Sequence, residues 1–116
     1  QVSPDTLKDN GAPELLGQAV LNLLRNAIRA TADSDRPMVR FTISRMGRGQ
    51  VRIEIRDNGP GIPEDRREDI FLPFYTTHKG GSGVGLSCAR QVALAHGGSI
   101  SAGDAAEGGA KLVMVI

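Results

Sequence analysis

Gln18-Ala-Val-Leu-Asn22-Leu-Leu-Arg-Asn26-Ala-Ile-Arg29 is the stretch of sequence that decides the fold of this chain. Apolar residues recur through it and beyond it at the 3.6-residue spacing of a helix, which predicts one broad buried face. That face comprises Leu16, Ala19, Val20, Leu23, Leu24, Ala27, Ile28 and Thr31. A polar stripe lies opposite and comprises Gln18, Asn22, Arg25, Asn26 and Arg29. Asparagine is unfavourable inside a helix because its amide competes for backbone hydrogen bonds, so the asparagine pair indicates either a solvated face or a binding site.

Two predicted strands follow this helix. We expect the helix to begin near Pro13 and to end near Asp33 to Arg36, before Pro37. Apolar and polar residues then alternate in two runs, which predicts two half-buried strands joined by a hairpin loop at 46–50. The inward residues are Val39, Phe41 and Ile43 in the first strand, and Val51, Ile53 and Ile55 in the second.

The second half of the chain predicts two more helices and two more strands. A short helix can start at Pro63, and a longer one runs from about Val84 to His96, where two glycines end it. Final strands are expected near 99–102 and 110–116, and residues 1–12 predict a frayed start or a short edge strand. This order predicts an α/β sandwich in which about three helices cover one face of a mixed, largely antiparallel sheet.

Composition narrows the class of protein. The 116 residues are 40% apolar and 3% aromatic, which suits a single domain over 1–116 with an aliphatic core. The net charge of +1 predicts no nucleic-acid partner. No stretch is apolar enough to span a membrane, and no signal peptide opens the chain. Because the first residue is Gln1, we expect a piece of a longer protein.

A single cysteine, Cys88, excludes an internal disulfide and fits a reducing, cytoplasmic compartment. It lies in an apolar helical segment, which favours a buried packing residue over a nucleophile.

Asp57-Asn-Gly-Pro-Gly61 ends the second predicted strand. Asp57 has the same parity as Ile53 and Ile55, so its carboxylate is predicted to point inward. A buried carboxylate is costly unless it is hydrogen-bonded or paired. Two interpretations follow: a strand-ending turn, for which this tetrapeptide is well suited, or an acceptor for a ligand edge such as an exocyclic amine. In the second case Gly59 and Gly61 would let the ligand lie against the backbone.

Gly80-Gly-Ser-Gly-Val-Gly85 directly precedes the second long helix. Backbone N–H groups at a glycine-rich helix start suit phosphate oxygens, although a flexible loop is the alternative. A dinucleotide fingerprint would need a strand immediately before the glycines, and Thr76-Thr-His-Lys79 stands there instead. A Walker-type loop would need Gly-Lys before Ser or Thr, which this segment lacks.

The polar stripe of the first helix offers a third candidate site. An asparagine carbonyl oxygen is a hard ligand that Mg²⁺ accepts beside phosphates and water. Arg29, on the same stripe, is suited to contact a phosphate.

Four segments in order resemble the ATP-binding catalytic domain of sensor histidine kinases, over about residues 14–116. Asn22-Leu-Leu-Arg-Asn26-Ala resembles the asparagine box, Asp57-Asn-Gly-Pro-Gly61 the first glycine box, Phe71-Leu-Pro-Phe74 the phenylalanine box, and Gly81-Ser-Gly-Val-Gly85-Leu the second glycine box. Gly108-Gly109 fits the turn before the last strand, and Phe74-Tyr-Thr-Thr77 is similar to the nitrogen-regulation type of kinase.

The resemblance implies the Bergerat fold of the GHKL superfamily, with ATP and Mg²⁺ under a mobile lid at about Thr76–Ser82. Asn26, together with Asn22, would coordinate Mg²⁺, Arg29 would reach the phosphates, and Asp57 would accept from the adenine amine. The other implied nucleotide-binding residues are Leu23, Ala30, Gly59, Gly61, Ile62, Thr77, His78, Lys79, Gly81, Ser82, Gly83, Val84, Gly85 and Leu86. Two positions depart from the family pattern: His78 replaces a common Lys, and Ala110 a common Thr.

The same resemblance implies transfer of the γ-phosphoryl group to a histidine on a separate dimerisation domain, and then signalling through a response regulator. Neither His78 nor His96 has the surroundings of a phosphoacceptor, so we expect no autophosphorylation of this chain alone. Related ATPases carry a glutamate at the position of Asn22; an amide cannot act as a general base, which favours a kinase. A non-catalytic nucleotide-binding module, a GHKL ATPase and a protein serine kinase are the alternatives.

Overall fold

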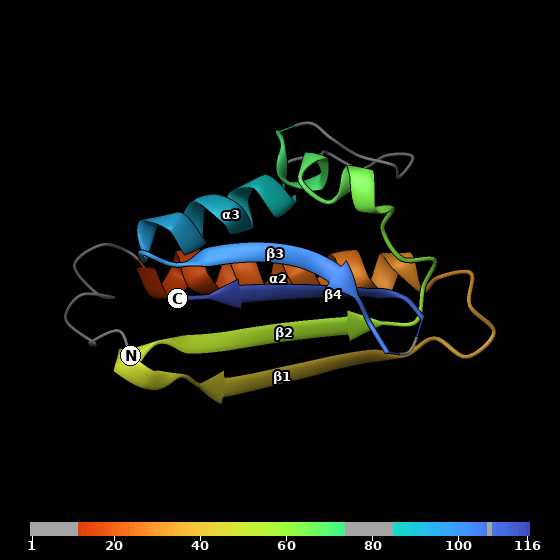
Figure 1. Cartoon of the computed structure of the whole chain (residues 1–116), viewed down its shortest axis with the longest axis horizontal. Helices are drawn as coiled ribbons and strands as arrows, with labels where there is room; N and C mark the ends of the chain where they lie inside the picture. The colour runs from red at the N-terminus through yellow and green to blue at the C-terminus, as the bar shows by residue number, and fades with distance from the viewer. Residues whose placement is uncertain (1–11, 74–84, 107) are drawn as a thin grey trace.

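The computed structural model describes residues 12–73, 85–106 and 108–116 (Figure 1). Its elements in chain order are α2 (Ala12–Ala30), β1 (Val39–Arg45), η1 (Gly47–Gly49), β2 (Val51–Asp57), η2 (Glu64–Arg66), η3 (Asp69–Phe71), α3 (Gly85–Ala95), β3 (Ser99–Asp104) and β4 (Ala110–Val115). Here η denotes a short 3-10 helix. None of the described helices has the length and apolarity needed to cross a membrane.

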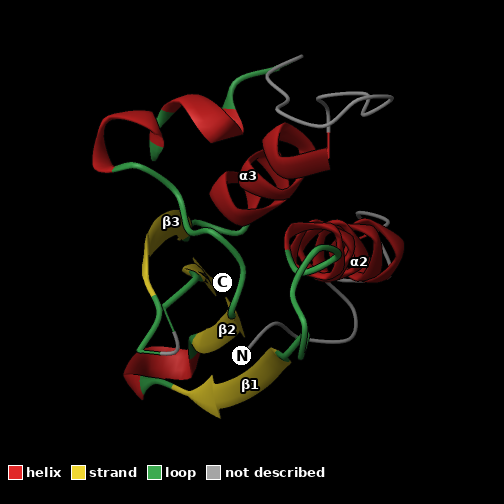
Figure 2. Ribbon diagram, turned by 90° about the vertical axis from the view of Figure 1, so that its right-hand side faces the viewer, coloured by secondary structure: helices red, strands yellow, loops and turns green. Residues whose placement is uncertain are grey.

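The four described strands form one sheet in the order β1-β2-β4-β3, and every neighbouring pair is antiparallel. Both α-helices lie on the same side of this sheet (Figure 2). The predicted α/β sandwich is therefore confirmed. The expected short helix after Pro63 is present as the two 3-10 turns η2 and η3.

The boundaries of the elements are close to those predicted, with one shift at the end of α2. The helix ends at Ala30 rather than near Asp33 to Arg36, and the N–H of Thr31 bonds back to the carbonyls of Ala27 and Ile28, at 3.2 Å each. The side-chain hydroxyl of Thr31 also donates to Ile28 O at 3.0 Å. These bonds satisfy the last helical carbonyls and close the helix early.

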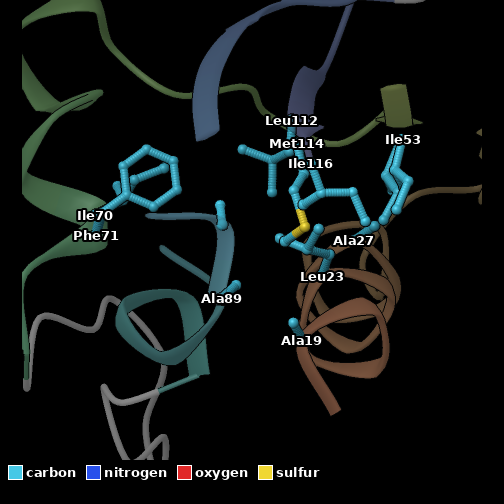
Figure 3. Close-up of a cluster of buried hydrophobic side chains, with 12 residues drawn as sticks. Ala19, Leu23, Ala27, Ile53, Ile70, Phe71, Ala89, Leu112, Met114 and Ile116 are labelled. Atoms are coloured by element: carbon cyan, nitrogen blue, oxygen red, sulfur yellow. The ribbon is translucent and has the colours of Figure 1, made fainter. Parts of the chain in front are cut away.

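The core lies between the helices and the sheet (Figure 3). Leu23, Ile55 and Met114 have the largest fully buried side chains. Figure 3 shows Leu23 and Ala27 of α2 directed toward the β4 residues of the cluster. Phe71, 4% exposed, belongs to the same cluster, whereas Phe74 lies outside the described residues.

Three residues expected in the core are exposed instead. On the helix-facing side of β1, Phe41 and Ile43 are 40% and 59% exposed, and Ile28 of α2 is 61% exposed. The alternation gave the correct face of β1, but β1 lies at the edge of the sheet that the described strands form, and α2 packs chiefly over β2 and against α3. Cys88 is also exposed, contrary to the prediction, because the buried positions of α3 fall to Ser87, Ala89 and Ala93.

The opposite face of the sheet carries an ion-pair cluster that sequence periodicity did not predict. Glu54 has outward parity yet is only 7% exposed, and its two carboxylate oxygens lie 2.9 Å from Arg52 Nη2 and 2.9 Å from Arg56 Nε. Burial opposes ionisation of this carboxyl, but the hydrogen bond from Arg52 and the charges of Arg52, Arg56 and Lys111 outweigh it and lower the pKa of Glu54.

Candidate functional site

Asp57, the last residue of β2, is a buried carboxylate at the end of the sheet where α2 also ends. It is 2% exposed, as its inward parity predicts. Its Oδ1 accepts hydrogen bonds from two main-chain N–H groups, of Gly59 at 2.9 Å and of Ala110 at 3.2 Å. Both of these bonds reach the same oxygen. The second oxygen, Oδ2, is therefore the one suited to receive a donor from a ligand.

Glycines surround this carboxylate because the backbone approaches it too closely for a side chain. A Cβ atom at Gly109 would overlap the carbonyl oxygen and Oδ1 of Asp57. A Cβ at Gly59 would come within 2.5 Å of the carbonyl oxygen of Ala30. Gly61 adopts a φ of +79°, which is accessible to glycine at little cost. The first glycine box thus combines a buried acceptor with bare backbone.

The polar stripe of α2 reaches from this carboxylate to the start of α3. Asn22 Nδ2 donates to the carbonyl of Gly85, the first residue of α3, at 3.2 Å, and Asn22 Oδ1 accepts from Gln18 Nε2 at 3.2 Å. At the other end of the stripe, Ala30 packs its carbonyl against Gly59. Ala30 lies eight helical steps after Asn22, which is about 12 Å at the helical rise per residue. This length suits an elongated ligand rather than a compact one.

The remaining residues implied by the resemblance fall into three groups. Asn26, Ala30 and Ile62 are half-buried beside the stripe and Asp57, and Arg29 is exposed on the same helix. Leu23, expected near adenine, is fully buried in the core, whereas Leu86 is half-buried at the start of α3. Residues outside the described part of the chain are Thr77, His78, Lys79, Gly81, Ser82, Gly83 and Val84.

The sequence did not predict that Gly109 and Ala110 contribute to the site. The main-chain N–H of Ala110 holds the Asp57 carboxylate, and Gly109 makes room for it. The only sequence signal was the Gly108-Gly109 pair before the last strand. An N–H contribution could not be recognised from it, because any residue except proline supplies that donor.

The arrangement has two chemically different ends. At one end, a buried carboxylate oxygen framed by bare backbone can read an N–H group on a flat ligand edge. Toward the other end, amide side chains on α2 and the first turn of α3 offer hard oxygen ligands and backbone N–H groups. The residues present therefore fit a nucleotide with Mg²⁺ at its phosphates.

A family model described as "Histidine kinase-, DNA gyrase B-, and HSP90-like ATPase" matches residues 11–116. The C4-dicarboxylate transport sensor protein DctB of Rhizobium meliloti is 36% identical over 97 residues, which are 84% of this chain and 16% of DctB. The sensory histidine kinase/phosphatase NtrB of Salmonella typhimurium is 36% identical over 96 residues, covering 76% of this chain and 28% of NtrB. The chain thus spans less than a third of either relative.

Solved structures agree with the sequence matches. The mycobacterial sensor histidine kinase MprB superposes with a TM-score of 0.79 at 34% identity, over 89% of this chain and 70% of that one. Full-length ShkA in complex with AMPPNP gives a TM-score of 0.75 at 32% identity, over 87% of this chain and 21% of that one. With the motifs at Asn22–Asn26 and Asp57–Gly61, these matches place the chain in the family of histidine kinase-, DNA gyrase B- and HSP90-like ATPases, as a catalytic ATPase domain of the sensor histidine kinase kind.

Proposed function

We propose that this chain, as one domain, binds ATP with Mg²⁺ and presents the γ-phosphoryl group to a histidine on a separate dimerisation domain. The observation that carries the proposal is the Asp57 carboxylate. It is 2% exposed, and both of its main-chain hydrogen bonds reach Oδ1. An inward acceptor of this kind supports recognition of the adenine amine through Oδ2.

Asn26 is the proposed Mg²⁺ ligand, with Asn22 in a different role. The amide of Asn22 already bonds to Gly85 O and to Gln18, so it joins the polar stripe to the start of α3. Asn26 lies one turn further along the same face, half-buried. When bound, Mg²⁺ would neutralise charge on the phosphates, and Arg29 would add a cation beside them.

Asn22 also supports phosphotransfer over hydrolysis. A hydrolase needs a base that takes a proton from the attacking water, and a carboxamide has no basic site near neutral pH. The side chain of Asn22 also donates a hydrogen bond to Gly85 O, which gives it a structural role between α2 and α3. A histidine supplied by another domain would then be the acceptor, and positioning of ATP would be this chain's contribution to catalysis.

The partners proposed are the dimerisation domain of the same kinase and a response regulator, in the cytoplasm. Similarity to sensor kinases, with Phe74-Tyr-Thr-Thr77 pointing to the nitrogen-regulation type, supports this assignment. We further propose that the chain alone does not autophosphorylate. Radiolabel transferred from ATP to this chain at the rate of an intact kinase would contradict that statement.

A calorimetric titration with an ATP analogue, with and without Mg²⁺, tests the metal site. Asn26→Ala is expected to remove the Mg²⁺-dependent part of the affinity and to leave the Mg²⁺-independent part. Leu21→Ala is the matched control, because Leu21 is an exposed residue of the same helix. Equal Mg²⁺ dependence in the Asn26→Ala variant and the unmodified chain would show that Asn26 is not the ligand.

A further inference from the structure

Arg67 connects two parts of the molecule that meet at Asp57. Its Nε donates to the carbonyl oxygen of Ile62 at 3.2 Å, and its Nη2 lies 2.6 Å from Asp104 Oδ1. Ile62 directly follows the first glycine box, whereas Asp104 is the last residue of β3. One guanidinium therefore ties the turn after β2 to the hairpin of β3 and β4.

The turn that Arg67 holds contains residues that lose much backbone entropy when they are ordered. Residues 58–61 include two glycines, and Gly61 adopts a φ of +79°. Glycine loses more backbone entropy on ordering than any other residue, so such a turn is costly to fix. At its start the turn is fixed by the pairing of Asp57 with Val39 and by the hydrogen bonds that Asn58 makes with Met38 and with Arg36 O. The N–H of Gly59 also bonds to Asp57 Oδ1. At its far end, the hydrogen bond from Arg67 to Ile62 O provides the restraint.

The other partner of Arg67 leads to the carboxylate itself. Asp104 pairs with Ala110 across the hairpin, and the N–H of Ala110 is the donor to Asp57 Oδ1. Gly61 packs against the same hairpin, where a Cβ would meet the carbonyl oxygens of Gly109 and Gly108 at 3.7 and 3.8 Å. The bond between Arg67 and Asp104 is thus the outermost of three contacts that close the turn onto the hairpin.

We infer that Arg67 is a positioning residue for recognition of the base, because it fixes both walls that orient the Asp57 carboxylate. The inference rests on the proposed function and deepens it. Arg67 does not touch the ligand in this account. It ties the turn at Ile62 to the hairpin at Asp104, on the two sides of Asp57, so that Oδ2 stays aligned with the amine of adenine. Alignment of this kind decides how well a site separates two similar ligands.

The size of the effect follows from the exposure of the contact. The side chain of Arg67 is 24% exposed and that of Asp104 is 79% exposed, so solvent screens the ion pair. The planar guanidinium nevertheless makes both contacts at once, which a lysine ammonium on a flexible stem would do poorly. We expect the loss of Arg67 to weaken ATP binding about two- to fivefold, which is the range of a solvent-screened contact.

The test compares the affinities of ATP and ITP, since ITP carries a carbonyl in place of the adenine amine. In Arg67→Ala, ATP affinity is expected to fall about two- to fivefold, whereas ITP affinity changes less, so the ratio of ATP affinity to ITP affinity falls. Arg67→Lys is expected to recover part of that preference for ATP. Asp104→Asn should lower the preference for ATP over ITP, as Arg67→Ala does. In the Arg67→Ala background, Asp104→Asn should have no further effect on this preference, because the two residues form one contact.

Arg90→Gln is the matched control. Arg90 lies 3.9 Å from Glu68 and so connects α3 to the same segment as Arg67, but it has no contact with the turn or the hairpin among the described interactions. Its removal is expected to leave both affinities unchanged. All titrations are made well below the melting temperature of each variant, so that a loss of stability does not register as a loss of affinity.

Two results would contradict the inference in distinguishable ways. If Arg67→Ala keeps the full preference for ATP while Asp57→Asn loses it, the proposed function stands and the role of Arg67 is wrong. If the unmodified chain binds neither ATP nor ITP, the proposed function itself fails, and the inference fails with it.

Discussion

Two buried carboxylates lie three residues apart on β2, and they differ in what neutralises them. Glu54 faces away from the helices, and its two oxygens are held by Arg52 and Arg56 at 2.9 Å each. Asp57 faces the helix side, and two main-chain N–H groups bond to one of its oxygens. At Glu54, arginine side chains compensate the negative charge and occupy both carboxylate oxygens. The arrangement at Asp57 holds the carboxylate in place through one oxygen, Oδ1.

Burial of an acid is therefore not by itself a mark of function. Glu54 is 7% exposed and Asp57 is 2% exposed, so accessibility hardly separates them. The neighbours do separate them: arginine side chains surround one carboxylate, and bare glycine backbone surrounds the other. We therefore expect Glu54 to contribute to stability and Asp57 to contribute to ligand affinity.

The largest effect is expected from filling the space beside Asp57. Gly109→Ala puts a methyl group onto the carbonyl oxygen and Oδ1 of Asp57, so the hairpin must shift. We expect a loss of about 3 kcal/mol in the free energy of unfolding, at the upper end for overpacking, together with a loss of ATP affinity. Chemical denaturation and calorimetry measure the two quantities.

Gly103→Ala is the control for that substitution. A Cβ at Gly103 of the same hairpin would meet only the end of the Lys111 side chain, at 3.8 Å. This variant should keep the affinity for ATP. If Gly109→Ala were equally well tolerated, the close approach of the hairpin to Asp57 would be wrong.

A smaller effect, on stability alone, is expected from the other carboxylate. Glu54→Gln leaves two arginines without their shared counter-charge, which should cost about 1–3 kcal/mol, typical for hydrogen bonds to charged groups. Affinity for ATP should not change, because Glu54 lies on the opposite face of the sheet from Asp57. Urea unfolding and an ATP titration of the same variant test both halves of the statement. A large change in the ATP affinity of Glu54→Gln would contradict the assignment of Glu54 to stability and Asp57 to ligand binding.

The pH dependence of stability gives the smallest effect. The pKa of Glu54 is lowered from its ordinary value of 4.5, because the hydrogen bond and the charge of Arg52, with those of Arg56 and Lys111, outweigh burial. A carboxyl with a depressed pKa stabilises the fold above its unfolded-state pKa and loses that contribution as pH falls through its folded-state pKa. Stability should therefore fall below about pH 4.5, and less steeply in Glu54→Gln. Identical profiles for the two proteins would contradict the ion-pair account.

Much of the fold was predictable because the local periodicity of apolar residues determines the helices, the strands and their buried faces. The helix containing Asn22 and Asn26, the hairpin loop and the inward parity of Asp57 all follow from residues close together in sequence. Periodicity assigns each residue to a face, however, and does not say what covers that face. Ile43 has inward parity and is 59% exposed, whereas Glu54 has outward parity and is buried under arginine side chains.

The candidate site was predictable only where it is formed by side chains whose identity is visible in the sequence. The burial of the Asp57 carboxylate could be anticipated from its parity in β2. The contact between Arg67 and Asp104 could not, because the two residues are 37 positions apart and each alone resembles an ordinary surface charge. The N–H of Ala110, 53 positions from Asp57, belongs to the main chain and leaves no trace in residue identity.

A single titration series shows whether Asp57 Oδ2 accepts a hydrogen bond from the amine of adenine. ATP and ITP are titrated against the unmodified chain and Asp57→Asn, with Glu54→Gln as the control for loss of a buried acid on the same strand. We predict that Asp57→Asn lowers ATP affinity about 10- to 100-fold while ITP affinity is kept or improved, since the asparagine amide can donate to the carbonyl of ITP. Unchanged binding of ATP by Asp57→Asn, or equal losses for ATP and ITP, would contradict the account.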